Sequence, residues 1–431
     1  MRHLFICVCF IALGSVFSCK EQHGETVLPE PKKTAYAADS LHLTREGYYD
    51  KVLGALVGSA IGDAMGASTE MWHRRDIQRK YGYITGLTPA TREQSPEGTW
   101  EHNLSAGATT DDTRWKYLMV NYFTSTGRGL SADHFANFIT SYYQGVASGL
   151  KDKEVVANPD ALDGKLEKID WIKEWAMVAL AFQQGPDEYR AAQHRFYGGE
   201  MSCAGMLYTP MFGLVAPDPE SAYTSAYEHA LFDLGYARDI SALVSSMTHM
   251  AMRTKNMDSI LNTAVFVDPM RYQDSRLVGR ISGRIAETAR KSVWLAQEIG
   301  VADSVNLKDL LSLQIPTSFG GSKTDWARQE FVYTKLEKDK KAIAFHAGEI
   351  WQILITALEF GGGDFKKTLQ FIVNYGRDND TVAAVAGMIL GAKDGFILLP
   401  EELKEEVLRV NRQQLGIDLQ ALAQQMVDEL Y

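Results

Sequence analysis

Apolar residues recur at helical spacing along most of the chain after Tyr48. Four segments place them three and four positions apart, namely residues 115–122, 171–182, 350–358 and 382–389. This spacing corresponds to one face of an α-helix. Strand-type alternation is scarce, and proline- and glycine-rich stretches between the periodic segments are typical of loops. The pattern predicts an all-α body. We expect one large domain, because the body shows no internal repeat and no evident linker.

The first nineteen residues follow a different pattern. A short basic start precedes an apolar run over residues 4–17, which is shorter than the ~20 residues needed to span a bilayer and fits a signal peptide. The run ends at Ser18-Cys19, which resembles the lipobox of bacterial lipoproteins. We therefore expect residues 1–18 to be a lipoprotein signal peptide. The exported protein would be anchored to a bacterial membrane by a lipid on Cys19, at the periplasm or the cell surface; an ordinary secretory signal is the alternative.

Composition indicates how the chain is divided and which kinds of partner it lacks. Residues 19–45 are polar and aperiodic with two prolines, which predicts a flexible tether before a folded domain at residues 46–431. Lys and Arg number 44 against 54 Asp and Glu, a net charge of −10. This acidity argues against a nucleic-acid partner held by basic residues. Cys203 is the single cysteine after Cys19, so a disulfide within the body is excluded, and we expect a buried structural cysteine. The oligomeric state is not defined by the sequence.

A stripe of glycines marks residues 53–67, where every fourth position from Gly54 to Gly66 is glycine. Each glycine in a helix costs ~1 kcal/mol relative to alanine, so the stripe indicates a compensating gain. Close approach of a second helix is one interpretation. The other is a helix end that carries acids into a site, because Asp63 and Glu70 are seven positions apart and share a helix face. Unpaired carboxylates would be unfavourable in a dry seam of small residues.

Two other segments place aspartates at the start of an apolar helix. They read Thr110-Asp111-Asp112-Thr113 and Asp378-Asn379-Asp380-Thr381. Taken singly, either is an ordinary helix start, since Thr caps helices and Asp suits the first turn. If the two starts meet, four carboxylates repel one another unless cations lie between them. Oxygen ligands suit Mg²⁺ or Mn²⁺ rather than zinc, and two divalent ions would balance the four charges.

These two segments and residues 62–70, in this order, resemble the three signatures of the ADP-ribosylglycohydrolases. The resemblance implies a single large orthogonal helical domain with a binuclear Mg²⁺ or Mn²⁺ centre that hydrolyses the bond between C1″ of ADP-ribose and its acceptor. Carried over, the metal ligands are Thr110, Asp111, Asp112, Asp378, Asp380 and Thr381. The implied catalytic residues are Glu70, Asp111 and Asp112, with Asp63 in a supporting role. A metal orients or acidifies water while a carboxylate moves the proton.

The chain also departs from the family pattern where substrate would bind. Ser202 and Leu207 stand where many members have asparagine and arginine, and Arg377 stands where a glycine is usual. Arg377 either binds an anionic substrate or pairs with a ligand aspartate. Tyr375 either stacks on a base or sugar or belongs to the core. We predict Ser202, Arg377 and Tyr375 as substrate-binding residues.

The expected activity is hydrolysis of a glycosidic bond in a small-molecule or ADP-ribosylated substrate, ADP-ribosyl or related ribosyl. One alternative is a binuclear-metal hydrolase of another nucleoside, nucleotide-sugar or glycoside. A second is a non-catalytic ligand-binding member of the fold, which is disfavoured because all six implied ligands and Glu70 are present. We expect insertions at about residues 215–345, and we expect His346 and Glu349 to serve helix packing.

Overall fold

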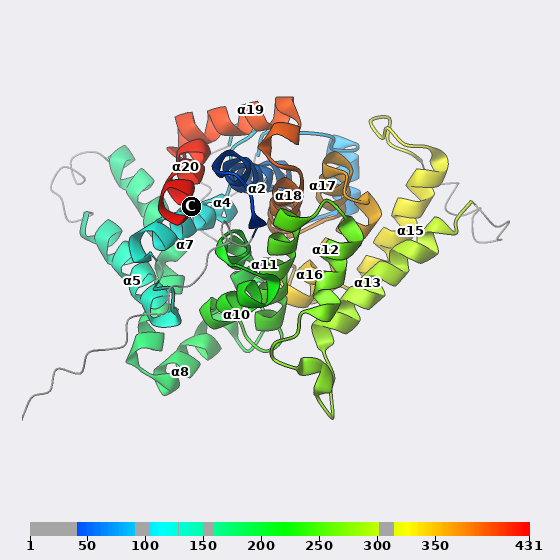
Figure 1. Ribbon diagram of the computed structural model, residues 1–431. Coiled ribbons are helices and arrows are strands. Elements are labelled where there is room, and N and C mark those ends of the chain that lie inside the picture. The colour runs from blue at the N-terminus through cyan, green and yellow to red at the C-terminus, as the bar shows by residue number, and fades with distance from the viewer. Residues whose placement is uncertain (1–40, 91–103, 128, 150–158, 301–313) are drawn as a thin grey trace, which may run out of the picture. The chain divides into compact units, whose positions relative to one another are not determined.

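Helices make up nearly all of the regular structure. The computed structural model describes residues 41–90, 104–127, 129–149, 159–300 and 314–431 (Figure 1). The predicted signal peptide and most of the predicted tether lie outside these residues. The chain from Ala35 to Tyr431 groups as one compact unit. In its described part the named strands are β1 (Trp72–His73) and β2 (Gly376–Arg377), which pair antiparallel. The all-α prediction is confirmed.

Helices occupy most of the described residues. Their bounds, in chain order, are α2 (Arg45–Gly66), α3 (Arg74–Tyr81), α4 (Asp111–Thr126), α5 (Ala132–Gly149), α7 (Pro159–Gln184), α8 (Pro186–Tyr197), α9 (Phe212–Val215), α10 (Pro219–His229), α11 (Ala237–Arg253), α12 (Met257–Phe266), α13 (Ile281–Gln297), α15 (Lys323–Asp339), α16 (Ala347–Gly361), α17 (Phe365–Tyr375), α18 (Asn379–Asp394), α19 (Glu401–Val410) and α20 (Leu419–Leu430). Shorter turns are η1 (Ala204–Leu207), η2 (Thr209–Met211), η3 (Tyr272–Asp274), η4 (Phe396–Leu398) and the π-helical η5 (Asn411–Leu415). None of the described helices is long and apolar enough to cross a membrane.

The periodic segments become helices whose apolar faces are buried. Residues 115–122 lie in α4, 171–182 in α7, 350–358 in α16 and 382–389 in α18. Trp115, Leu118, Met119 and Tyr122, the apolar positions of α4, are fully buried. Burying such a stripe is the main source of stability for a helix in a protein. The region where we expected insertions is also helical in its described part, from α10 to α15.

The glycine stripe lets α2 and α18 pack backbone against backbone (Figure 1). A Cβ atom on Gly58 would lie 2.3 Å from the carbonyl oxygen of Gly387, and one on Gly391 would lie 2.0 Å from that of Gly54. At Gly62 the nearest atom would be the carbonyl oxygen of Ala383, at 1.9 Å. No side chain fits at these positions. The close-approach interpretation of the stripe is confirmed.

Glu70 does not lie on the same helix as Asp63. Helix α2 ends at Gly66, and residues 67–71 form turns, so the shared helix face that we expected for the two acids is wrong. The physical reason is the seam itself, because a Cβ on Gly66 would lie 2.4 Å from Cα of Asp380, at the start of α18. The chain turns away at that point. Asn379 holds the turn, since its Nδ2 donates to Oγ1 of Thr69 at 2.8 Å.

Candidate metal centre and cleft

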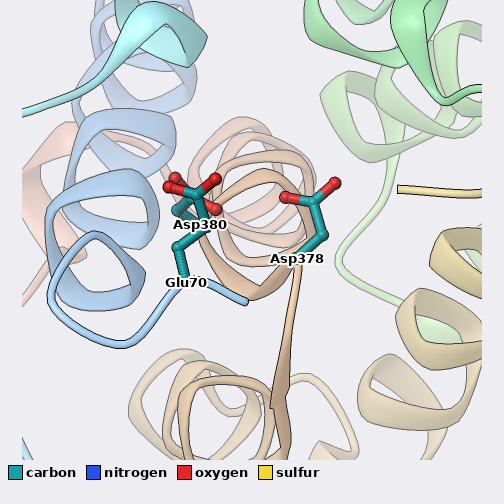
Figure 2. Close-up of side chains that lie close together, drawn as sticks. All are labelled: Glu70, Asp378 and Asp380. Carbon is teal, nitrogen blue, oxygen red and sulfur yellow. The ribbon is translucent and has the colours of Figure 1, made fainter. Parts of the chain in front are cut away.

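Three carboxylates converge where the turn after α2 meets the start of α18. Oxygens of Glu70, Asp378 and Asp380 lie within 4.8 Å of one another, and all three residues are buried (Figure 2). Asp378 occupies the N-cap of α18, yet its side chain makes no capping hydrogen bond. Asp380 follows in the first turn of the same helix. Buried carboxylate oxygens at this spacing are the donors that hard divalent cations prefer.

The two-residue ribbon β1–β2 holds Glu70 beside Asp378. Trp72 pairs with Arg377, and the N–H of Met71 donates to the carbonyl oxygen of Arg377 at 2.6 Å. Met71 follows Glu70 and Arg377 precedes Asp378, and their φ angles are 63° and 65°. A left-handed backbone at a residue other than glycine is unfavourable and is often found at functional sites. This conformation accounts for the glycine usual at position 377 in the family.

Asp63 fixes the start of α4. Its carboxylate accepts the backbone N–H of Thr110 at 2.9 Å and that of Thr113 at 3.0 Å. The hydroxyl of Thr113 donates to it at 2.6 Å. Burial raises the pKa of Asp63 to about 6, although these hydrogen bonds favour the carboxylate form. Asp63 is therefore committed to holding α4, which agrees with the supporting role implied by the family resemblance.

The two acidic helix starts meet, a point that the sequence left open. The hydroxyl of Thr381, in α18, donates to Oδ2 of Asp112, in α4, at 3.0 Å. Burial raises the pKa of Asp112 well above its ordinary value. Lys116 opposes this rise, and the nearby carboxylates of Asp63 and Asp380 add to it. Thr110 caps α4, because its hydroxyl oxygen accepts the N–H of Asp112 at 3.2 Å. The junction thus brings acidic groups from both helix starts together in a buried site.

A cleft of about 530 Å³ opens over this junction. The predicted site residues that line it are Glu70, Asp111, Asp112, Ser202, Asp378, Asp380 and Thr381. Thr110 is buried and is not among the lining residues. Aromatic side chains of α7 and α8 form one wall, joined by Phe345; they are Trp171, Trp175, Phe196 and Tyr197. Trp115 of α4 backs this wall, with its ring centroid 4.8 Å from that of Trp175.

The divergent loop at residues 202–207 forms another part of the cleft. Ser202 and His346 form an isolated β-bridge, and the N–H of Gly205 donates to Oδ1 of Asp233 at 2.7 Å. Cys203 is buried, and its thiol donates to Oδ2 of Asp378 at 3.4 Å. Burial, with the negative charge of Asp378, raises the pKa of this thiol well above its ordinary value. A thiol held protonated is a poor nucleophile, in keeping with the structural role we expected.

Arg377 and Tyr375 do not line the cleft. Arg377 forms a bidentate ion pair with Glu349, with Nε 2.6 Å from Oε1 and Nη2 3.0 Å from Oε2. Its partner is therefore a glutamate that we had assigned to helix packing, and not a ligand aspartate. Tyr375 is 3% exposed and packs on Tyr333, with ring centroids 5.2 Å apart. This position matches the core alternative for Tyr375. Both residues border a smaller pocket beside β1.

Sequence reasoning missed two groups at this site. The aromatic wall had been interpreted only as helix periodicity, although Trp171 and Trp175 face the cleft. Lys116 was overlooked altogether. It lies four residues after Asp112 in α4, its Nζ is 3.5 Å from Oδ1 of Asp112, and it is 1% exposed. The available signal was a lysine within the apolar periodicity of a helix that begins with two aspartates.

The fold and the cleft define a helical protein with an acidic centre built from oxygen donors. The family model of ADP-ribosylglycohydrolase matches residues 44–431, and the chain belongs to this family. It is 22% identical over 356 residues to an uncharacterized protein of Archaeoglobus fulgidus, covering 83% of this chain and 91% of that one. It is also 22% identical over 371 residues to the uncharacterized protein YegU of Escherichia coli K12, covering 84% and 93%. A solved ADP-ribosylglycohydrolase-related protein complex aligns at 16% identity and a TM-score of 0.47, over 90% of this chain and all of that one.

Proposed function

We propose that the protein is a Mg²⁺- or Mn²⁺-dependent hydrolase that cleaves the glycosidic bond of an ADP-ribosyl or related ribosyl substrate. One observation carries the proposal. Three buried carboxylates converge within 4.8 Å at a cleft large enough for a small molecule. The family of the chain supports a glycohydrolase.

The donor set fits hard cations. Glu70, Asp378 and Asp380 would hold an ion, and Asp111, Asp112, Thr110 and Thr381 supply the remaining oxygens near it. When bound, such an ion polarises sugar hydroxyls and makes water more acidic. The support for a metal ligand at Asp378 is its position, because its buried carboxylate lies within 4.8 Å of those of Glu70 and Asp380.

Some side chains of this centre would transfer the proton, and others position those side chains. In the proposed reaction water adds to C1 of the ribose as the bond from C1 to the acceptor breaks. A proton passes from the water to a carboxylate, Glu70 or Asp111, and then to the departing acceptor. Asp63 keeps Asp111 and Asp112 in place by holding the first turn of α4. The aromatic wall keeps bulk water from one side of the cleft.

The cleft walls favour a substrate with a flat ring. Trp171, Trp175, Phe196 and Tyr197 offer faces and edges on which a base or a sugar packs. Oγ of Ser202 is buried and makes no hydrogen bond with the described residues, so it has a hydroxyl to offer the substrate.

A second candidate is a hydrolase of a neutral nucleoside or glycoside. Lys173 is the single cationic side chain among the described residues that line the cleft. A diphosphate is usually held by several cations or backbone N–H groups. Because the cleft lining offers so few cations, a substrate without phosphate groups also fits it.

A substrate panel tests the function. Purified protein with Mg²⁺ or Mn²⁺ is offered ADP-ribosyl-arginine, ADP-ribosyl-serine, nucleotide sugars and nucleosides, and released sugar is measured. Asp111→Ala should abolish turnover, whereas Asp428→Ala, an exposed control in α20, should retain it. Unchanged turnover in Asp111→Ala would refute the metal assignment. Binding of ADP-ribose without hydrolysis of any substrate would instead indicate a binding protein.

We also propose that the protein is exported and anchored through a lipid on Cys19. The support is the sequence of residues 1–19 alone. In a bacterial host, labelled palmitate should enter the wild-type protein and not a Cys19→Ser variant. Equal labelling of both proteins would reject the anchor.

A further inference from the structure

Lys116 is a cation inside the carboxylate junction. It is 1% exposed, and its Nζ makes no hydrogen bond with the described residues. The nearest carboxylate oxygen, Oδ1 of Asp112, is 3.5 Å away, and the charge of Lys116 also reaches Asp63. Burying an ammonium group that lacks hydrogen bonds is unfavourable unless opposite charge surrounds it. The position of Lys116 is therefore sustained by these two acids.

The acids of the junction fall into two groups. One oxygen from each of Glu70, Asp378 and Asp380 lies within 4.8 Å of the other two. Asp112 stands apart from this triad, because Oδ1 faces Lys116 and Oδ2 accepts the hydroxyl of Thr381. The first group has the spacing of a cation site, and Asp112 of the second pairs with the ammonium group of Lys116.

A fixed positive charge beside Asp112 opposes a second divalent ion there. Opposite and like charges interact strongly in a buried site, where the effective dielectric is far below that of water. The ammonium group of Lys116 both repels such an ion and competes for the carboxylate that would bind it. We infer that the centre holds a single divalent cation, at Glu70, Asp378 and Asp380, and that Lys116 takes the place of the second. The inference rests on the proposed metal dependence.

Counting bound ions tests this arrangement without relying on turnover. The purified protein is dialysed to equilibrium against Mn²⁺, and metal per chain is measured by mass spectrometry. The wild type should bind one Mn²⁺. Lys116→Met, which keeps the length and removes the charge, should approach two, with second-ion affinity raised on the order of 100-fold. Lys116→Arg should stay at one.

A matched control separates the site from general effects of losing a buried lysine. Lys404 is also buried and pairs with Glu401 at 2.8 Å, in α19, so Lys404→Met should stay at one ion. Two ions of similar affinity in the wild type would overturn the inference, even if Lys116→Met fails to fold. A folded Lys116→Met that still binds one ion would overturn it as well. A wild type that binds no ion rejects the metal centre, whereas one ion without hydrolysis of any substrate rejects the proposed activity alone.

Discussion

Replacing Gly62 by alanine should separate the two helices that carry the site. The added Cβ would lie 1.9 Å from the carbonyl oxygen and 2.3 Å from the carbonyl carbon of Ala383. Both are backbone atoms, and the shorter distance falls about 1.5 Å below the 3.4 Å at which ordinary contact begins. Overpacking of a core costs ~1–3 kcal/mol or more, against a gain of ~1 kcal/mol in helix propensity. We expect a net loss of about 2 kcal/mol, at the upper end of the resulting range, because backbone cannot move aside as a flexible side chain does.

Thermal melting followed by circular dichroism measures the loss of stability, and equilibrium dialysis against Mn²⁺ measures metal binding at the site. Gly62→Ala should lower the melting midpoint by several degrees and weaken Mn²⁺ binding, since Asp380 lies on α18 and Asp63 on α2. Gly145→Ala in α5 is the matched control, because nothing lies within 4 Å of its added Cβ. That variant should be as stable as the wild type or slightly more so. A Gly62→Ala protein that melts no lower than the wild type would refute the steric argument.

Three further changes follow from the same geometry. Asp63→Ala should destabilise the protein by about 2–4 kcal/mol in urea melts, because two buried N–H groups lose their acceptor; a loss below about 1 kcal/mol would contradict this. Burial raises the pKa of Asp233 from 3.8 to about 6. The folded protein therefore keeps a proton that the unfolded chain has lost, so this group lowers stability as pH rises from about 4 to about 6, by up to about 3 kcal/mol. Asp233→Asn should flatten that part of the pH profile relative to the wild type, and parallel profiles would refute the assignment. Chelation by EDTA should abolish turnover, and Mn²⁺ should restore it; turnover that survives exhaustive chelation would rule out metal dependence.

Much of this fold could be predicted from the sequence because helices bury stripes of regular period. The stripe from Trp115 to Tyr122 gives α4 directly. Glycines at every fourth position predict a close helix seam, since only such a seam offsets their cost. The meeting of the two acidic helix starts was implied by the resemblance to the family, whereas the residues by themselves left it open.

Other features depend on contacts that local patterns do not contain. Periodicity would continue α2 to Glu70, but the backbone of Asp380 blocks the way at Gly66. The sequence leaves Arg377 available to a substrate, but in the fold it pairs with Glu349, which is 28 residues away in the chain. Lys116 resembles a solvated residue until the fold buries it beside Asp112. In the first two cases a partner distant in sequence decides the outcome, and in the third the tertiary packing around α4 does.

The seam between α2 and α18 also bears on how substrate preference diverges in such a protein. Its glycines leave no room for even one added methyl group at Gly58 or Gly62, so the seam itself tolerates almost no change. The wall from α7 and α8 packs through side chains, which accept exchange more readily than a backbone contact does. New specificities would therefore arise by exchange of side chains in this wall, and not by change in the seam between α2 and α18.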